Sequence, residues 1–292
     1  LGGRAVALEL GQAMARFGVD VLILQRSPRL IPDQEPDASR AIKDYFEREG
    51  IAVVTGVQIE RLSRAGQKRT VHARVAGRER QFSADQILMA LGREANTEGM
   101  GLDTVGVEVD ADGRVIVDAS MQTSNPAIYA AGDVTINPEF VYVAAAGGSL
   151  AAQNALAEGK KPLDLSTMPS VIFTDPQIAA VGFTEARARE KGFDVITSVI
   201  GLEYVARAQA ARDTRGLIKL VADKASRRLL GAHLVAAEAG EAIQTAALAI
   251  KFGATIDDLT DTLFPYLTQV EGIKLAALAF DKDLAMLSCC AS

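Results

Sequence analysis

The sequence is poor in several features that mark particular classes of protein. It contains no tryptophan, two histidines and two cysteines among 292 residues. No apolar run reaches the ~18 residues of a membrane-spanning helix, and no signal-peptide pattern is recognisable. The net charge is −6 and no basic block is present, which argues against nucleic acid or an anionic membrane as partner. With 49% hydrophobic and 23% charged residues, the chain is typical of a globular protein. Unprotected thiols fit the reducing cytoplasm, where we expect this protein.

Both cysteines stand side by side in the final segment, as Cys289-Cys290. Adjacent Cα atoms lie ~3.8 Å apart, less than the ~4.4–6.8 Å that disulfides usually span. A disulfide between them would therefore be strained and easily reduced, whereas two neighbouring thiolates suit one soft metal ion. The alternative is that Cys289 and Cys290 are simply two small residues near the end of the chain, without a function. Because exposed free thiols are open to oxidation, we favour metal handling as the role of Cys289 and Cys290.

The order of expected elements favours an α/β fold. Helical composition and strand composition alternate through the first part, which predicts a doubly wound nucleotide-binding sheet with a β insertion. Helices are expected at 5–17 and 36–50, and strands at 19–24, 51–54, 58–63, 69–76, 79–82 and 86–90. An Asp-Gly hairpin at 107–117, a strand at 128–133 and an Ala-rich helix at 141–158 follow.

Beyond a linker at 159–162, the pattern predicts a separate α+β domain. Strands are expected near 170–174, 178–182, 194–201, 216–222 and 229–235, with helices at 184–191, 241–252 and 269–281. The chain begins with Leu1 rather than Met, in what reads as the turn after a strand. We therefore expect an N-terminally truncated chain.

The first residues resemble a dinucleotide-binding glycine turn. Gly2-Gly3-Arg4-Ala5-Val6-Ala7-Leu8-Glu9 follows the pattern G-x-G-x-x-A, except that Arg4 replaces the second glycine. Gly2 would form the tight turn and Ala7 would allow close helix–strand packing. We place Gly2 and Glu9 among the cofactor-binding residues.

The end of the next expected strand predicts which nicotinamide cofactor is used. NAD enzymes place an acidic residue there to bind the ribose 2′-hydroxyl, but this chain has Gln25-Arg26-Ser27. Arg26, with Arg29 nearby, would instead bind a 2′-phosphate through charge-assisted hydrogen bonds. A solvated loop charge is the alternative for Arg26. Together with the glycine turn, Arg26 favours NADPH over NADH.

Two further motifs place the chain beside a known family. They are Ala90-Leu91-Gly92-Arg93-Glu94-Ala95-Asn96 and Thr123-Ser124-Asn125-Pro126-Ala127-Ile128-Tyr129-Ala130-Ala131-Gly132-Asp133. With the glycine turn, they resemble the pyridine nucleotide–disulfide oxidoreductases, whose patterns are A-T-G-R-x-P-N and T-x-x-x-x-I-Y-A-x-G-D. The first motif departs from its pattern at Leu91 and Ala95.

The resemblance implies FAD as well as NADPH. It implies that Gly92 lies at the cofactor, that Asp133 binds the flavin ribityl chain, and that Val141 begins a helix whose N-terminus approaches the flavin. A helix or turn cap is the alternative for Asp133. We expect an NAD(P)-binding domain at 1–98, a returning segment of the FAD-binding domain at 99–163, and a dimerisation domain at 164–292.

One position separates this chain from the disulfide-reducing members of the family. They carry H-P-T-x-x-E, in which the histidine exchanges protons with thiol substrates, whereas this chain has Tyr266-Leu267-Thr268-Gln269-Val270-Glu271. His72 and His233 lie far from this motif in sequence, so the usual imidazole relay is not expected. Tyr266 together with Cys289 and Cys290 resembles the branch of the family that reduces Hg(II). A core or interface tyrosine is the alternative for Tyr266.

The resemblance implies NADPH- and FAD-dependent reduction of Hg(II) to Hg(0) by a homodimer. The cysteine pair of one subunit would capture Hg(II) for the partner's active site, which Tyr266 would line. Apolar helices at 241–251 and 270–280 fit an interface, although both could be core. The family's C-x-x-x-x-C and first FAD-binding glycine motif are absent, so we expect this chain by itself to be inactive. A thiol-disulfide or dihydrolipoamide-type flavoprotein, or a dimerisation and soft-metal-binding module, are the alternatives.

Overall fold

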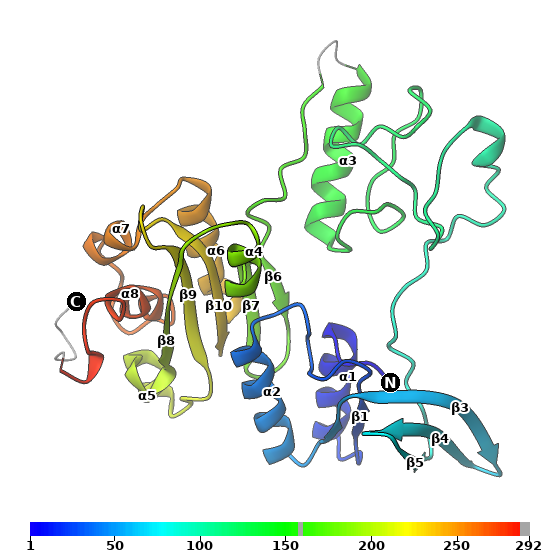
Figure 1. Ribbon diagram of the computed structural model, residues 1–292, viewed down its shortest axis with the longest axis horizontal. Coiled ribbons are helices and arrows are strands. Elements are labelled where there is room, and N and C mark those ends of the chain that lie inside the picture. Colours follow the sequence, from blue (N-terminus) through cyan, green and yellow to red (C-terminus); the bar gives the residue numbers. More distant parts are fainter. Residues whose placement is uncertain (157–159, 287–292) are drawn as a thin grey trace. The chain divides into compact units, whose positions relative to one another are not determined.

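The computed structural model describes residues 1–156 and 160–286. These form two compact units, one made of Leu1–Leu91 and the part from Ser166 onward, the other of Gly92–Leu165 (Figure 1). The mixed α/β character predicted from the sequence is confirmed. None of the helices in the described ranges is both long and apolar enough to cross a membrane.

The N-terminal part of the first unit alternates helices and strands before a β meander. Its elements are α1 (Ala5–Arg16), β1 (Leu22–Leu24), α2 (Pro36–Arg48), β2 (Ala52–Val54), β3 (Val57–Ala65), β4 (Lys68–Val75) and β5 (Arg78–Ala84). Strands β1 and β2 pair in parallel, and β3-β4-β5 form an antiparallel sheet. The fully buried Ile42 and Phe46, four residues apart on α2, pack with Leu8 and Ile23 in one core.

Two strands expected in this part are shorter or missing. The predicted strand at 19–24 begins at Leu22, because the N–H of Val19 bonds back to the carbonyl of Met14 at the end of α1. Residues 86–90 are extended beside the first residue, with Ala90 N donating to Leu1 O at 2.9 Å, but they form no strand. The hydrogen bonds of this segment to a neighbouring extended residue are those with Leu1, and pairing with one residue is too little to form a regular strand.

The C-terminal part of the first unit is a five-stranded antiparallel sheet with the order β6-β7-β10-β9-β8. Its elements are β6 (Ser170–Ile172), β7 (Gln177–Gly182), α4 (Glu185–Glu190), β8 (Val195–Gly201), α5 (Ala206–Ala211), β9 (Leu217–Asp223), β10 (Leu229–Ala236), α6 (Ala239–Lys251), α7 (Ile256–Asp261) and α8 (Glu271–Leu278). The predicted strands are confirmed, while the short helices α5 and α7 were not predicted.

The two faces of this sheet have different partners. Alternate residues of β9, Ile218, Leu220 and Ala222, share one core with side chains of both α6 and α8. Both helices therefore contribute to the domain's own core from the same face of the sheet. On the other face, Ile178 and Val235 share a core with residues of α2, so the two halves of this unit are packed together.

The second unit contains α3 (Val141–Leu156), a short 3-10 helix at Asp103–Val105, and isolated β-bridges. The strands expected at 107–109, 115–117 and 128–133 form only single bridged pairs, such as Val109 with Val115. Side chains satisfy much of the backbone in place of a ladder: Ser124 accepts from Glu108 N at 2.8 Å and donates to Gly106 O at 2.8 Å. The predicted Asp-Gly turn forms, with Gly113 at φ 77° and Asp110 N donating to Arg114 O at 2.8 Å.

Candidate functional site

The glycine turn before α1 is shaped so that side chains cannot enter it. Gly2 has φ 114°, and a Cβ added there would lie 2.2 Å from the carbonyl oxygen of Ala90. A Cβ on Gly3 would lie 2.9 Å from the side chain of Gln25. Helix α1 begins directly afterwards, and Arg4 at its N-cap provides no side-chain cap. Uncapped N–H groups at a helix start and a backbone without side chains make a cradle for an anion such as a pyrophosphate.

Of the two arginines after β1, only Arg26 is positioned for a ligand. Its side chain is exposed, and no ion pair or hydrogen bond to its guanidinium is present in the described part of the chain. The backbone N–H of Arg26 donates to Gln25 Oε1 at 3.0 Å, which fixes the start of the loop. The guanidinium of Arg29 instead donates to the carbonyls of Gln34 at 2.7 Å and Pro32 at 2.5 Å. Arg29 therefore holds its own loop together.

Glu9 and Gln12 join α1 to the C-terminal part of the same unit. Glu9 Oε1 accepts from Phe173 N at 2.8 Å. Gln12 exchanges two hydrogen bonds with the backbone of Asp175, each of 2.8 Å. The cofactor role of Glu9 stays a prediction, and its observed partner is this backbone amide beyond β6.

In the second unit, Asp133 is paired with an arginine. Arg93 Nη1 lies 2.5 Å from Asp133 Oδ2, and Arg93 Nε lies 3.6 Å from Glu139 Oε2. Gly132, at φ 85°, passes close to α3, because a Cβ there would lie 3.3 Å from the Ala144 methyl. Asp133 and Glu139 precede the start of α3 in the sequence, and Arg93 comes from 40 residues before Asp133. Arg93 belongs to the motif at residues 90–96, but its ion pair with Asp133 was not predicted.

The beginning of α3 is open at one residue and more enclosed at the next. Val141 is 83% exposed, while burial raises the pKa of the Tyr142 hydroxyl. The rings of Phe140 and Tyr142 stack with centroids 5.2 Å apart. Gly92, in the same unit, has φ 139°, a conformation that L side chains rarely adopt.

Tyr266 lies on a turn that leads into α8. Its side chain is 59% exposed, and Leu263 on the same segment is 90% exposed. Neither histidine can assist it. His72 Nε2 is 2.8 Å from Ser63 Oγ in the β3–β4 pair. His233 is buried in β10 beside the carbonyl of Phe183, at 3.0 Å, and burial lowers its pKa.

The predicted residues fall into separate groups. Gly2 and Arg26 flank the same turn, and Asp133 lies with Arg93 in the other unit. Tyr266 precedes α8, and α8 lies away from α1 (Figure 1). Cys289 and Cys290 lie outside the described residues. Among the residues that the structure does describe, no group of three or more His, Cys, Asp or Glu side chains is arranged to hold a metal ion.

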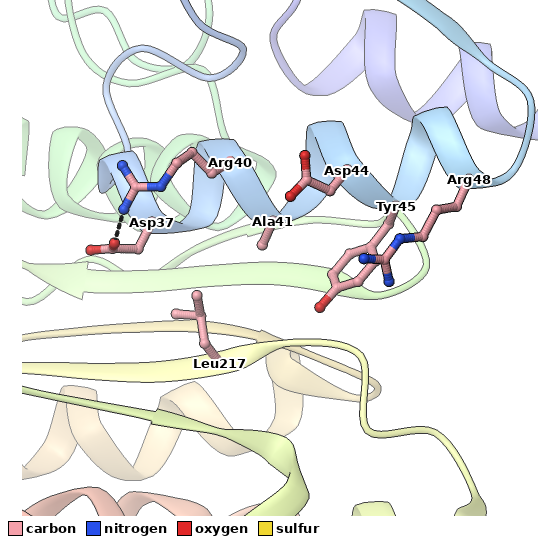
Figure 2. Close-up of a pocket in the computed structure, with 7 residues that line it drawn as sticks. All are labelled: Asp37, Arg40, Ala41, Asp44, Tyr45, Arg48 and Leu217. Carbon is pink, nitrogen blue, oxygen red and sulfur yellow. Dashed lines mark hydrogen bonds and ion pairs between the residues drawn. The ribbon is translucent and has the colours of Figure 1, made fainter.

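A shallow pocket along α2 holds none of the predicted site residues. It is lined by Asp37, Arg40, Ala41, Asp44, Tyr45, Arg48 and Leu217 (Figure 2). Arg40 is ion-paired with Asp37, and the guanidinium of Arg48 lies 5.8 Å from the centre of the Tyr45 ring. Because these cations already have partners within the pocket wall, we assign the pocket no ligand.

A buried charge cluster beside this helix was not predicted. Lys219 Nζ lies 2.9 Å from Glu35, 3.2 Å from Asp37 and 3.0 Å from Glu185. Burial by itself lowers the pKa of Lys219, but the hydrogen bonds to Glu35 and Glu185 outweigh it and raise that pKa. Hydrogen bonding to Lys219 lowers the pKa of Glu185. These charged residues come from separate segments of the chain, and none stands in a motif that would predict its burial. The sequence therefore carried no signal for the cluster.

Comparison of the sequence with those of known proteins finds similar proteins of known name. Mercuric reductases from Staphylococcus aureus, Streptomyces lividans and Shigella flexneri are each 46% identical over 291 residues. The alignments cover 100% of this chain but 53%, 61% and 51% of those proteins. The chain thus spans about half the length of several of the curated relatives it matches.

Two solved structures have the same fold as this chain. The HOCl-induced flavoprotein disulfide reductase RclA from Escherichia coli aligns with a TM-score of 0.86 and 28% identity, covering 95% of this chain and 63% of that one. LpdA from Mycobacterium tuberculosis aligns with a TM-score of 0.86 and 28% identity, covering 96% of this chain and 61% of that one.

Family models account for most of the sequence. The model for the dimerisation domain of pyridine nucleotide-disulphide oxidoreductases matches residues 168–277. The model for the pyridine nucleotide-disulphide oxidoreductases themselves matches residues 1–159, which include the glycine turn, Arg26 and Asp133. With its motifs, its fold and this match in agreement, the chain belongs to the pyridine nucleotide-disulphide oxidoreductase family.

Proposed function

We propose that the protein containing this chain is a cytoplasmic homodimer that reduces Hg(II) to Hg(0) with NADPH, through FAD. The observation that carries this proposal is Tyr266 on its exposed turn, in the register where disulfide-reducing members have a histidine. Identity of 46% to mercuric reductases along the whole chain supports it. The proposed dimer rests on the match of residues 168–277 to the family's dimerisation domain.

Family membership implies FAD and NAD(P)H as cofactors, and the residues at the glycine turn fit a dinucleotide. A Cβ on Gly2 would clash with the Ala90 carbonyl oxygen, so this position requires glycine, and no side chain of Gly2 would separate a pyrophosphate from the backbone N–H groups at the start of α1. Arg26, exposed at the end of β1, would bind the 2′-phosphate that distinguishes NADPH. We infer a preference for NADPH from this cation and from the lack of a carboxylate at the same place.

In the second unit, the ion-paired group before α3 fits a polar chain of hydroxyl groups. Asp133 supplies a carboxylate that can accept hydrogen bonds from the ribityl hydroxyls, and Arg93 holds that carboxylate in place. The start of α3 at Val141 would present its N-terminal dipole to the flavin ring. When bound, the two cofactors supply two electrons, so that NADPH and Hg(II) become NADP⁺, a proton and Hg(0).

The replacement of histidine by Tyr266 suits this substrate. Reduction of a disulfide yields two thiols and requires protons, which an imidazole can exchange near neutral pH. Reduction of Hg(II) to Hg(0) requires electrons but adds no proton to the product. A tyrosine hydroxyl can line such a site through its oxygen. We propose that role for Tyr266.

The adjacent cysteines would supply the soft ligands. Two thiolates bind Hg(II) strongly because both partners are soft, and a pair at neighbouring positions can hold one ion between them. We propose that Cys289 and Cys290 capture Hg(II) and pass it to the partner subunit. No other cysteine occurs in the sequence.

The test is Hg(II)-dependent NADPH oxidation by the complete gene product, without competing small thiols. We expect turnover with Hg(II), and a lower kcat/KM for Hg(II) in Tyr266→Phe and in the Cys289→Ala/Cys290→Ala double variant. NADPH oxidation with ferricyanide as acceptor serves as the control, because it requires neither Tyr266 nor the cysteine pair. Unchanged Hg(II) turnover and affinity in the cysteine variant would exclude delivery by this pair.

A disulfide reductase is the second candidate, since RclA carries that name. Its test is the same protein assayed with lipoamide and glutathione disulfide. Turnover with a disulfide but none with Hg(II) would select this candidate, and Tyr266→His would then be expected to raise disulfide turnover.

A further inference from the structure

Helix α8 carries two buried charged residues directly after the turn that bears Tyr266. The residue Glu271 is 6% exposed and Lys274 is 3% exposed. An ionised side chain loses its hydration when it is buried, and this cost must be offset by hydrogen bonds. The partners of these two side chains therefore indicate what each one stabilises.

Both side chains bind backbone atoms on the tyrosine segment. Glu271 Oε2 accepts from the N–H of Leu267 at 3.3 Å. Lys274 Nζ donates to the carbonyl oxygen of Thr262 at 3.0 Å. Leu267 has φ 64°, a left-handed conformation that is uncommon for residues other than glycine. The two contacts thus hold residues 262–267 at both ends, with Tyr266 between them.

The turn has a third support and a rigid base. Thr268 Oγ1 donates to Pro265 O at 2.7 Å and accepts from Glu271 N at 3.3 Å. Helix α8 packs closely on β9, since a Cβ on Gly272 would lie 2.4 Å from Ile218 Cδ1. The carboxylate and the ammonium are therefore mounted on an element that cannot easily shift toward or away from the turn.

We propose that Glu271 and Lys274 are positioning residues for Tyr266, an inference that rests on the proposed reduction of Hg(II). Glu271 is in register with the glutamate of the family pattern H-P-T-x-x-E, but no histidine precedes it here. Its carboxylate acts as a backbone acceptor that maintains the left-handed turn at Leu267. Lys274 fixes the opposite end, so the ring of Tyr266 is presented in one place.

Substitutions separate this role from an acid–base or charge role of Glu271. The amide oxygen of Glu271→Gln can still accept from Leu267 N, whereas Glu271→Met has a similar size and no acceptor. If Glu271 acts only as the acceptor for the Leu267 N–H, a role we call the backbone clamp, Glu271→Gln keeps the turn and Glu271→Met does not. If Glu271 acts through its charge or by proton transfer, both variants lose activity. Lys274→Met removes the other contact, and Lys282→Met, at an exposed lysine beyond α8, is its matched control.

The clamp is measured first by amide hydrogen exchange of the peptide spanning residues 262–270 in the complete gene product. We expect exchange at Leu267 to speed up about fivefold in Glu271→Met, the factor that a typical intramolecular hydrogen bond contributes. Glu271→Gln and Lys282→Met are expected to exchange like the unchanged protein. Equal exchange in Glu271→Met and the unchanged protein would overturn the clamp, whatever the enzyme reduces.

The consequence for Tyr266 is measured by kinetics. Misplacing the ring should lower kcat/KM for Hg(II) about 10- to 100-fold in Glu271→Met and Lys274→Met, with little change in ferricyanide reduction. In the Tyr266→Phe background the same substitutions should have a much smaller effect, since they act through that tyrosine. An equal loss in both backgrounds, or a loss in Glu271→Gln as large as in Glu271→Met, would refute the positioning role. Altered exchange in a protein that does not reduce Hg(II) would instead count against the proposed function alone.

Discussion

Replacing Lys219 by methionine tests whether the buried charge cluster holds the two halves of the first unit together. Lys219 on β9 is bonded to Glu35 and Asp37 at the start of α2, and to Glu185 of α4. The Lys219 and Glu35 side chains are 5% and 2% exposed. Methionine keeps most of the volume of lysine and removes the ammonium. Glu35 then loses its cation, while Asp37 and Glu185 keep Arg40 and Arg189 as partners.

The expected loss follows from the burial of this pair. Removing one partner of a buried ion pair destabilises a protein by about 3–5 kcal/mol, because the remaining charge is uncompensated. Glu35→Gln should cost less, since Lys219 keeps Asp37 and Glu185 as partners. Combining Glu35→Gln with Lys219→Met should restore part of the loss, since one buried negative charge is then removed as well.

The loss in Lys219→Met should depend on pH. Hydrogen bonding to Lys219 lowers the pKa of Glu185, so this contact contributes stability above the ordinary glutamate pKa of about 4.3. The contribution is lost as the pH falls through the lower pKa of the folded state. The methionine variant lacks it at every pH, and the stabilities of the two proteins should therefore converge in acid.

Urea unfolding over the range from pH 7 to below the ordinary glutamate pKa, down to about pH 3, measures both effects as a shift of the midpoint at constant m. Lys224→Met is the matched control, because Lys224 is 65% exposed and its contact with Asp194 is 3.9 Å long. It should change the free energy of unfolding by no more than about 0.5 kcal/mol. A Lys219→Met loss as small as this control, or one independent of pH, would refute the reasoning.

Three further predictions concern the cofactor, the buried histidine and assembly. Arg26→Glu should weaken NADPH far more than NADH, by about 10- to 150-fold for a lost charge-assisted contact worth ~1.5–3 kcal/mol; parallel changes of the two KM values would contradict it. Burial lowers the pKa of His233, so stability should fall as the pH drops below about 6.5. His233→Gln, which keeps a donor for the carbonyl of Phe183, should flatten this dependence, and an unchanged curve would show that His233 is not its source. The complete gene product should sediment as a dimer at sub-micromolar concentration, and a fully active monomer would exclude transfer of Hg(II) between subunits.

The sequence by itself determined those features that depend on local pattern. Helical composition at 5–17 and apolar spacing at 36–50 predict α1 and α2. Strand-like segments at 58–63, 69–76 and 79–82 predict the β3-β4-β5 meander. The glycine turn, Arg26 and the tyrosine in the histidine register are also readable from the chain. Each belongs to a short motif, and the cofactor role of Arg26 and the site role of Tyr266 stay predictions.

Tertiary structure decided the features that depend on contacts between distant segments. Residues 128–133 have strand composition but form one isolated bridge, between Gln122 and Tyr129, and the hydroxyl of Thr123 donates to the carbonyl of Ile128. Arg26 and Arg29 look equivalent in sequence, yet only Arg29 is bound by the carbonyls of its own loop. The placement of α6 and α8 on one face of the sheet also follows from packing rather than from their similar apolar composition.

The buried Lys219 shows most clearly the difference between what a sequence pattern predicts and what tertiary packing decides. Lys219 alternates with apolar residues on β9, a pattern typical of a solvent-facing lysine on a half-buried strand. Its side chain is nevertheless enclosed, because α2 covers that face of the sheet and brings Glu35 and Asp37, more than 180 residues earlier in the chain, against it. Periodicity tells which side of a strand a residue occupies, but only the packing of another segment decides whether that side faces water.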